Sequence, residues 1–320
     1  MRSVLAAALL AVSSLLAAPP SLAEPFRFVA LGDMPYGDKA EVYPPFEALI
    51  ARINQMQPAF TLHVGDIKSS VTPCDDAMFA EQLAFMNRFE AALIYTPGDN
   101  EWTDCHRASA GGFDPLERLA RIREMFFADA RSLGQAPVDL ERQSDAGPAY
   151  PTFVENARFM KSGVMFVTAH VVGSNNNFEP RSAEAVAEFF ARDQANIAWT
   201  EASFAKAEET GAAAVVVAIH AQALDAKTYY ADLPRHSGHA RWVRSFLDAA
   251  VAFGKPVLLI HGDSHRFKID RPFRRRGKPG ANVTRLEVLA PRGLHAVESR
   301  VAADPADTVT VRATGDTPQP

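Results

Sequence analysis

The chain has 320 residues, of which 48% are hydrophobic, and its formal net charge is -5 at pH 7. A mildly acidic chain has no overall basic field, so we expect no nucleic-acid partner. A mature chain of about 300 residues is near the upper limit for one hydrophobic core, which predicts a single large domain.

Residues 1–23 have the pattern of a cleaved secretory signal peptide. Arg2 precedes an apolar stretch from Val4 to Ala18, and small residues stand just before Glu24. We therefore expect residues 24–320 to form the mature domain, in the periplasm or secreted. No later segment reaches the roughly 18 apolar residues that a membrane span needs, so no span is expected. The alternative is an uncleaved N-terminal anchor.

The N-terminal third alternates strand-like and helix-like segments. Three apolar runs, each predicted to be a strand, end in the dipeptide Gly-Asp, at Gly32, Gly65 and Gly98. Apolar residues recur with helical spacing over residues 43–57 and 75–89. This order predicts successive βα units, whose parallel strands end at one edge of a sheet.

The rest of the chain continues the sheet and then changes character. A helix over residues 116–127 is followed by a polar excursion over the surface to about residue 161. Further strands are expected over residues 163–172, 212–220 and 255–265, and further helices over 183–209 and 239–253. Residues 284–290 and 308–313 alternate in hydrophobicity without a helix between them, which predicts antiparallel or edge strands in a mixed or second sheet.

Cys74 and Cys105 are the only cysteines. An exported chain meets oxidising conditions, so we predict that they form one disulfide. Each follows a Gly-Asp dipeptide by a few residues, which makes their loops neighbours if the dipeptides share one edge of a sheet. The alternative is two separate buried thiols.

Carboxylates and histidines stand where the predicted strands end. In α/β sheets, ligands bind outside the carboxyl ends of the strands. Several carboxylates crowded at such an edge repel one another unless a cation lies among them, and oxygen and imidazole ligands suit divalent metal ions. The alternative for each aspartate is a helix N-cap. The candidate metal ligands are Asp33, Asp66, Asp99, His220, Asp263 and His265.

Five short motifs, in order, resemble the sequence blocks of the calcineurin-like metallophosphoesterase superfamily, which includes purple acid phosphatases and many secreted bacterial phosphoesterases. They are "GDMPY", "GDIKS", "GDNEW", "VVAIH" and "IHGDSH", between residues 32 and 265. The resemblance implies an α/β fold, a four-layer α/β/β/α sandwich of mixed sheets. It also implies an exported phosphoesterase that holds two divalent metal ions and hydrolyses a small phosphorylated substrate with a metal-bound hydroxide. Monoesters, diesters, nucleotides and anhydrides all fit these motifs.

The resemblance assigns a role to each candidate ligand. Asp33 and His265 would hold the first metal ion, and Asp66 would bridge both ions. Carboxylates in place of the family's neutral amide and imidazole ligands favour manganese or magnesium, with iron and zinc as alternatives. The remaining ligands of the second ion would be Asp99 in place of an asparagine, His220, and Asp263 in place of a histidine.

Two positions depart from the family pattern. Pro35 replaces a ligating histidine, and Tyr36 is a candidate substitute, because Ser69 stands where purple acid phosphatases have their tyrosine ligand. Asn100 replaces a histidine that contacts phosphate and can protonate the leaving group, whereas an amide can donate a hydrogen bond only. His106, in the same loop, is therefore a candidate general acid, and a structural or solvated role is the alternative.

These departures motivate a second interpretation. A catalytically degenerate member of the superfamily would bind a phosphorylated ligand or a partner without turnover. Three nearby features also have two interpretations. Glu101 and Trp102 either shape the pocket wall or cap and pack their loop. The segment "SNNNF", residues 174–178, either touches substrate or is a plain turn.

Overall fold

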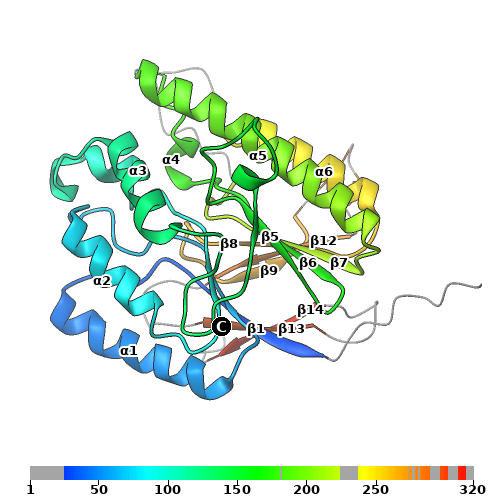
Figure 1. The fold of residues 1–320 in the computed structure, drawn as a ribbon, viewed down its shortest axis with the longest axis horizontal. Coiled ribbons are helices and arrows are strands. Elements are labelled where there is room, and N and C mark those ends of the chain that lie inside the picture. Colours follow the sequence, from blue (N-terminus) through cyan, green and yellow to red (C-terminus); the bar gives the residue numbers. More distant parts are fainter. Residues whose placement is uncertain are drawn as a thin grey trace, which may run out of the picture.

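The structure is a computed structural model, and it consists of two β-sheets packed face to face with helices on their outer faces (Figure 1). The predicted signal peptide, residues 1–23, lies outside the described residues. In the part of the chain that is described, no helix is both long enough and apolar enough to cross a bilayer. The described residues are 25–180, 182–223, 237–272, 274–275, 278–279, 282–288, 296–301 and 309–314.

The first sheet confirms the predicted βα units. Strands β1 and β2 run parallel with Val29 opposite Thr61, and β2 and β3 run parallel with Leu62 opposite Ile94. Two strands from the end of the chain extend this sheet: β13 pairs antiparallel with β1, and β14 pairs antiparallel with β13. The strand order is β14 (Val309–Thr314), β13 (Ala296–Val301), β1 (Phe26–Leu31), β2 (Thr61–His63) and β3 (Leu93–Tyr95).

The second sheet is also mixed. Its centre is parallel, from β6 through β7 and β8 to β12, and its edges are antiparallel. A short separate ribbon pairs β10 (Arg274–Arg275) with β11 (Lys278–Pro279). The strand order is β4 (Glu141–Arg142), β5 (Ala157–Lys161), β6 (Val164–Thr168), β7 (Ala214–Ala218), β8 (Val257–His261), β12 (Val283–Glu287) and β9 (Lys268–Asp270).

Helices cover the outer face of each sheet, which gives the four layers (Figure 1). One group lies against the first sheet: α1 (Lys39–Met56), α2 (Asp76–Met86) and α3 (Pro115–Phe126). The other lies against the second sheet: α5 (Ala183–Glu209) and α6 (Ala240–Phe253). The connections between these elements contain α4 (Gly173–Asn176) and three 3-10 turns, η1 (Thr103–His106), η2 (Ala108–Ala110) and η3 (Gln143–Asp145).

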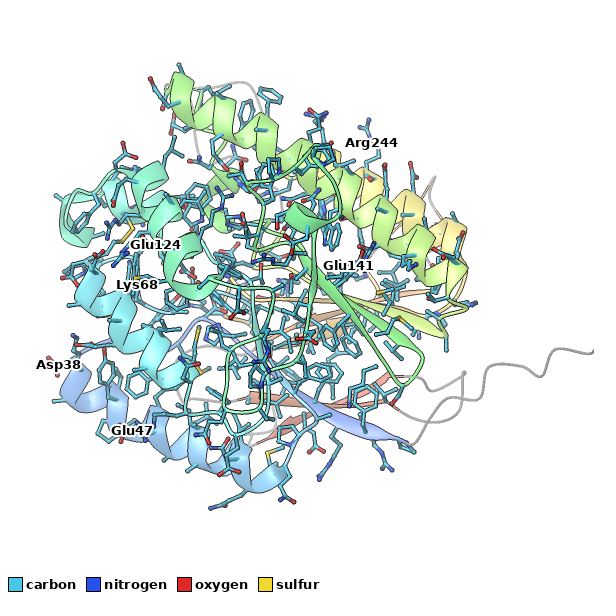
Figure 2. All side chains as sticks on the ribbon, in the orientation of Figure 1. Asp38, Glu47, Lys68, Glu124, Glu141 and Arg244 are labelled. Atoms are coloured by element: carbon cyan, nitrogen blue, oxygen red, sulfur yellow. A yellow bond between two sulfur atoms is a disulfide. The ribbon has the colours of Figure 1, made fainter. Side chains whose placement is uncertain are left out.

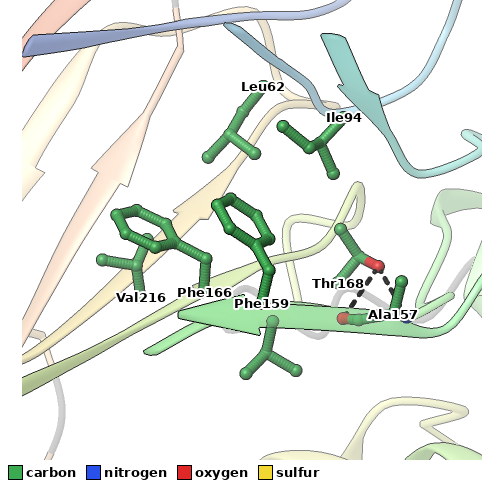
Figure 3. A pocket seen from close by; sticks show the side chains of 8 residues that line it. Leu62, Ile94, Ala157, Phe159, Phe166, Thr168 and Val216 are labelled. Carbon is green, nitrogen blue, oxygen red and sulfur yellow. Dashed lines mark hydrogen bonds between the residues drawn. The ribbon is translucent and has the colours of Figure 1, made fainter. Parts of the chain in front are cut away.

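The layer between the sheets is apolar and closed. Leu62 and Ile94 of the first sheet face Phe159, Phe166 and Val216 of the second, and the gap between them has no room for a water molecule (Figure 3). By contrast, the charged side chains of Glu47, Glu124, Glu141 and Arg244 are exposed (Figure 2). The interior between the sheets is therefore packing surface.

The segment expected to cross the surface before residue 161 contains part of the second sheet. Strand β5 pairs antiparallel with β6, with Phe159 opposite Phe166. Its residues Met160 and Lys161 lie at the surface and Ala157 is buried. Only the first two residues of β5 pair with the short β4, so the rest of β5 lies at the open edge of the sheet, where polar residues are common. Their mixture with apolar residues hides the periodicity from which the other strands were predicted.

The predicted disulfide joins Cys74 and Cys105, whose Cα atoms are 5.8 Å apart. It closes a loop with a sequence separation of 31 residues and links the segments that follow β2 and β3. Replacing both cysteines with serine is expected to lower the free energy of unfolding by about 3–4 kcal/mol, because the unfolded chain regains the entropy of an open loop. Urea unfolding measures this loss. A difference below about 1 kcal/mol would contradict the prediction.

Candidate metal centre

The side chains predicted as ligands meet where strands of both sheets end. Asp33, Asp66 and Asp99 follow β1, β2 and β3 of the first sheet, while His220 and His265 follow β7 and β8 of the second. Each carboxylate or imidazole offers one ligand atom, and within a group these atoms lie within 4.8 Å of one another. The two groups are Asp33, Asp66 and His265, and Asp66, Asp99 and His220. Asp66 belongs to both.

The three carboxylates are buried together. The exposed fraction is 0% for Asp33, 4% for Asp66 and 6% for Asp99. The N-cap alternative does not describe them, because the helices that follow are capped by Asp38, Asp75 and Asp114. Buried carboxylates in contact require a counter-charge, which a cation can supply.

His220 is oriented as a metal ligand would be. Its Nδ1 donates to the carbonyl oxygen of Val64 at 2.8 Å, which directs Nε2 toward the carboxylates. Nε2 lies 2.8 Å from Asp99 Oδ1 and 3.3 Å from Asp66 Oδ1. Metal-ligating histidines commonly donate the other ring N–H to a backbone carbonyl in this way, so this residue fits a metal ion.

The electrostatics of the centre follow from its burial. Burial raises the pKa of Asp66 well above its ordinary value, against the opposing charge of His220 and with the neighbouring Asp99 adding to the shift. For His220, burial lowers the pKa, but Asp66 and Asp99 outweigh it, and the pKa is raised well above its ordinary value. Both pKa shifts reflect carboxylates crowded in a buried site, where a bound cation would supply the missing positive charge.

The backbone at the strand ends adopts the left-handed region. The φ angle is 57° at both Asp33 and Asp66, 78° at Asp263 and 60° at His265. Residues other than glycine are uncommon there, and such strain is concentrated at functional sites. Three of these four residues, Asp33, Asp66 and His265, form one of the two ligand groups.

Three glycines make room for the three carboxylates. A Cβ atom on Gly98 would overlap with Asp66 Oδ1, and one on Gly262 would overlap with Asp33 Oδ2. A Cβ atom on Gly173 would come within 2.5 Å of Asp99 Oδ1. Gly98 and Gly262, which belong to Gly-Asp dipeptides, therefore leave space for a carboxylate that follows another strand.

Tyr36 and Asn100 hold the carboxylate shared by the two groups. The Tyr36 hydroxyl donates to Asp66 Oδ2 at 2.5 Å, and Asn100 Nδ2 donates to the same oxygen at 2.6 Å. Asn100 also donates its backbone N–H to Asp66 Oδ1 at 3.0 Å. Tyr36 thus lies beside the centre, as it would have to do to take the place of the ligand missing at Pro35.

Lys68 and the disulfide both contact the backbone carbonyl oxygen of Asn100. Lys68 is only 1% exposed, and its Nζ donates to the Asn100 carbonyl oxygen at 2.5 Å. The sulfur atoms of Cys74 and Cys105 lie 3.6 and 3.7 Å from the same oxygen. Figure 2 labels this buried lysine. Sequence reasoning missed it, although a lysine two residues after a strand-end aspartate was a visible signal.

Glu101 and Trp102 cap and pack their loop. Glu101 Oε1 accepts hydrogen bonds from the N–H groups of Asp66 at 3.0 Å and Gly98 at 2.7 Å. Trp102 is fully buried, with its ring 5.4 Å from that of His170. Both residues therefore fix the loops that carry Asp66 and Asp99.

Like Asn100, the predicted site residues Asp263 and His106 lie outside both ligand groups. Asp263 is at the same edge, but its Oδ2 accepts from the Gln222 N–H at 2.8 Å, and its own N–H donates to Asp33 Oδ1 at 3.0 Å. His106 places Nδ1 2.7 Å from the Thr103 carbonyl oxygen, on an exposed turn. Their roles as metal ligand and general acid stay predictions.

The fold is similar to that of two solved phosphatases. A dimetal phosphatase from Danio rerio has a TM-score of 0.51 at 10% identity, covering 86% of this chain and 95% of that chain. A purple acid phosphatase from yellow lupin (Lupinus luteus) seeds has a TM-score of 0.52 at 12% identity. That match covers 89% of this chain and 51% of the lupin chain.

The chain therefore has the calcineurin-like metallophosphoesterase fold, a mixed α/β architecture of two sheets with outer helices. The predicted fold class is confirmed. No protein-family model matches the sequence, and no curated protein sequence does. At identities this low the likeness establishes the fold, and the chemistry has to be argued from the site.

Proposed function

We propose that the protein is a metal-dependent phosphoesterase with a centre for two divalent metal ions. The observation that carries this proposal is the position of Asp66, which is shared by two groups that each contain two carboxylates and one imidazole. Oxygen and imidazole donors suit manganese, iron, magnesium or zinc, and the carboxylate-rich set favours the harder ions manganese and magnesium. The first ion would be held by Asp33, Asp66 and His265, and the second by Asp66, Asp99 and His220.

Bound divalent ions would supply positive charge for the phosphate oxygens and lower the pKa of water. The chain's own residues orient the reacting groups. Asn100 Nδ2 donates to the Tyr36 hydroxyl at 2.9 Å and to Asp66 Oδ2, and the Tyr36 hydroxyl donates to the same carboxylate oxygen. A phosphate oxygen would have to replace one of these partners to be held by either group, and Asn100 has no proton to give to a leaving group.

We also propose that residues 24–320 form one exported domain after removal of residues 1–23. The disulfide supports this proposal, because disulfides persist in oxidising compartments such as the periplasm or the extracellular space. The proposed substrate is a small phosphorylated molecule.

The alternative function is a binding protein with a degenerate site. Asn100 favours it, because the amide occupies the position of the family's proton-donating histidine and is committed to Asp66 through its backbone N–H and its side chain. A protein of this kind would bind metal ions and a phosphorylated ligand without hydrolysing it.

Elemental analysis and a leaving-group series test these functions together. The purified protein is expected to contain two divalent ions per chain and to hydrolyse p-nitrophenyl phosphate until a chelator removes them. Without a general acid, rates on alkyl phosphates should be lower by about 10²- to 10⁴-fold. Comparable rates on alkyl esters would show that another group, such as His106, supplies the proton. Bound metal without any turnover would favour the binding protein, and absence of metal would contradict both functions.

A further inference from the structure

A cavity of about 510 Å³ lies beside the candidate metal centre. It is bounded by the turn after β3, by the segment after β6 and by the first turns of α3 and α5. Its volume is within the range of pockets that hold small organic ligands. Its polar lining includes Thr103, Asp104, His106, Arg107, Ser174 and Asn177.

Ser174 connects this cavity to the centre. Its hydroxyl oxygen lies 2.8 Å from Asp99 Oδ2 and 2.8 Å from Asp104 Oδ1. Asp99 belongs to one of the two ligand groups, and both Ser174 and Asp104 line the cavity. One side chain therefore separates the cavity from the group that contains Asp99.

The wall that contains Ser174 has a strained backbone. Four consecutive residues, 174–177, have positive φ angles of 46°, 54°, 57° and 57°. Asparagine tolerates this region better than most residues, but left-handed residues normally occur singly, so four in succession persist only when their surroundings fix them. The segment predicted either to touch substrate or to be a plain turn is thus a constrained part of the cavity wall.

Buried hydrogen bonds hold this wall in place. Arg192 is fully buried, and its guanidinium donates to Asn176 Oδ1 at 2.6 Å and to the Asn176 carbonyl oxygen at 2.9 Å. Asn175 Oδ1 accepts from the Gly238 N–H at 2.8 Å. These contacts over-determine an unfavourable conformation, which points to a ligand-positioning role for the residues that face the cavity.

The charges of the lining are balanced at its inner end. Arg107 Nη1 pairs with Asp104 Oδ2 at 2.7 Å, so this arginine does not present an uncompensated charge to a second anionic group. Its other N–H groups remain donors. In the neutral His106 ring, Nδ1–H donates to the Thr103 carbonyl oxygen and leaves Nε2 as an acceptor. Glu179 also lines the cavity and adds carboxylate acceptors, and a mixture of donors and acceptors suits hydroxyl groups.

We propose that this cavity binds the hydroxyl-bearing ring of a phosphorylated sugar or ribonucleoside while its phosphate group lies at the metal centre. The inference rests on the proposed phosphoesterase function and adds the substrate class to it. Sugars and ribonucleosides share hydroxylated rings that donate and accept hydrogen bonds. Inorganic or very small phosphate compounds would leave the cavity empty.

Filling the cavity from α5 tests this inference. Ala185 lines the cavity and is partly buried, so Ala185→Phe would occupy part of its volume. Ala183 lies in the same first turn of α5 and is exposed, which makes Ala183→Phe the matched control. Arg107→Gln is a second variant at a surface position that removes a lining charge.

The kinetic measurement compares kcat/KM for glucose 6-phosphate, adenosine 5′-monophosphate and methyl phosphate, which all have alkyl leaving groups. At least one ring-bearing ester should be preferred over methyl phosphate, and the better ring substrate identifies a sugar or a nucleoside as the occupant. Ala185→Phe should reduce this preference by about tenfold or more, as expected when a pocket rejects a substrate group, and leave methyl phosphate unaffected. Arg107→Gln should reduce it in the same direction, and Ala183→Phe should preserve it.

Calorimetric titration of the metal-free protein with glucose and adenosine gives a readout that does not depend on catalysis. Binding by the wild type and by Ala183→Phe, with loss of binding in Ala185→Phe, would support the cavity proposal. If the same proteins hydrolysed no ester, the phosphoesterase function alone would be overturned. Equal hydrolysis of all three esters by wild type and Ala185→Phe would overturn the cavity proposal and leave the phosphoesterase function standing. Neither binding nor hydrolysis would overturn both.

Discussion

Replacing Asp66 with alanine is expected to remove both metal ions and to lower kcat/KM for p-nitrophenyl phosphate by about 10³-fold or more, which corresponds to roughly 4 kcal/mol. The reason is that Asp66 is the carboxylate common to both ligand groups. Without it, each group keeps one carboxylate and one histidine, which is too few ligands for tight binding of a hard divalent ion. Elemental analysis of the variant and its activity after dialysis against the metal measure both effects.

Two further variants make this result specific. His265 belongs to one group only, so His265→Ala should retain one ion per chain where Asp66→Ala retains none. Asp139, whose side chain is 96% exposed, is the control for loss of a carboxylate, and Asp139→Ala should keep both ions. Full metal content and unchanged activity in Asp66→Ala would refute the shared-ligand centre.

The positions of the carboxylates were predictable because they depend on local chain geometry. An aspartate that follows an apolar run lies at the carboxyl end of a strand, and parallel strands place those ends together. The pairing of β1, β2 and β3 confirms this step for Asp33, Asp66 and Asp99. His220 comes from the second sheet and reaches Asp99 because the two sheets pack with these strand ends at the same edge.

The rest of the site depends on contacts between segments that are distant in the sequence. Ser174 reaches Asp99 across 75 positions through a left-handed segment, and no local pattern indicates that conformation. Lys68 follows a strand-end aspartate by two residues, but its burial depends on contacts between loops, because Nζ lies against the Asn100 carbonyl oxygen beside the sulfur atoms of the disulfide. Packing between loops decides such positions, and single-sequence periodicity does not record it.

The glycines beside the carboxylates are also constrained by residues that are distant in the sequence. Gly98→Ala is expected to weaken metal binding by about 10- to 100-fold, the range typical for groups that orient metal ligands. Its new Cβ would overlap with both Oδ1 and the backbone nitrogen of Asp66. Relief of this overlap moves a ligand or its strand end, and a displacement of about 1 Å can cost 10²-fold in rate.

The same substitution should also lower the free energy of unfolding by about 1–3 kcal/mol, as overpacking does. Gly112→Ala is the control that separates the loss of stability from the loss of metal affinity. Gly112 has a φ of +69° and no atom within 4 Å of an added Cβ. The left-handed backbone alone should cost that control roughly 1–2 kcal/mol, without any change in metal affinity. Titration with Mn²⁺ and urea unfolding of both variants give the comparison. Equal metal affinity in the two variants would show that Gly98 is not placed against the ligand Asp66 as the structure has it.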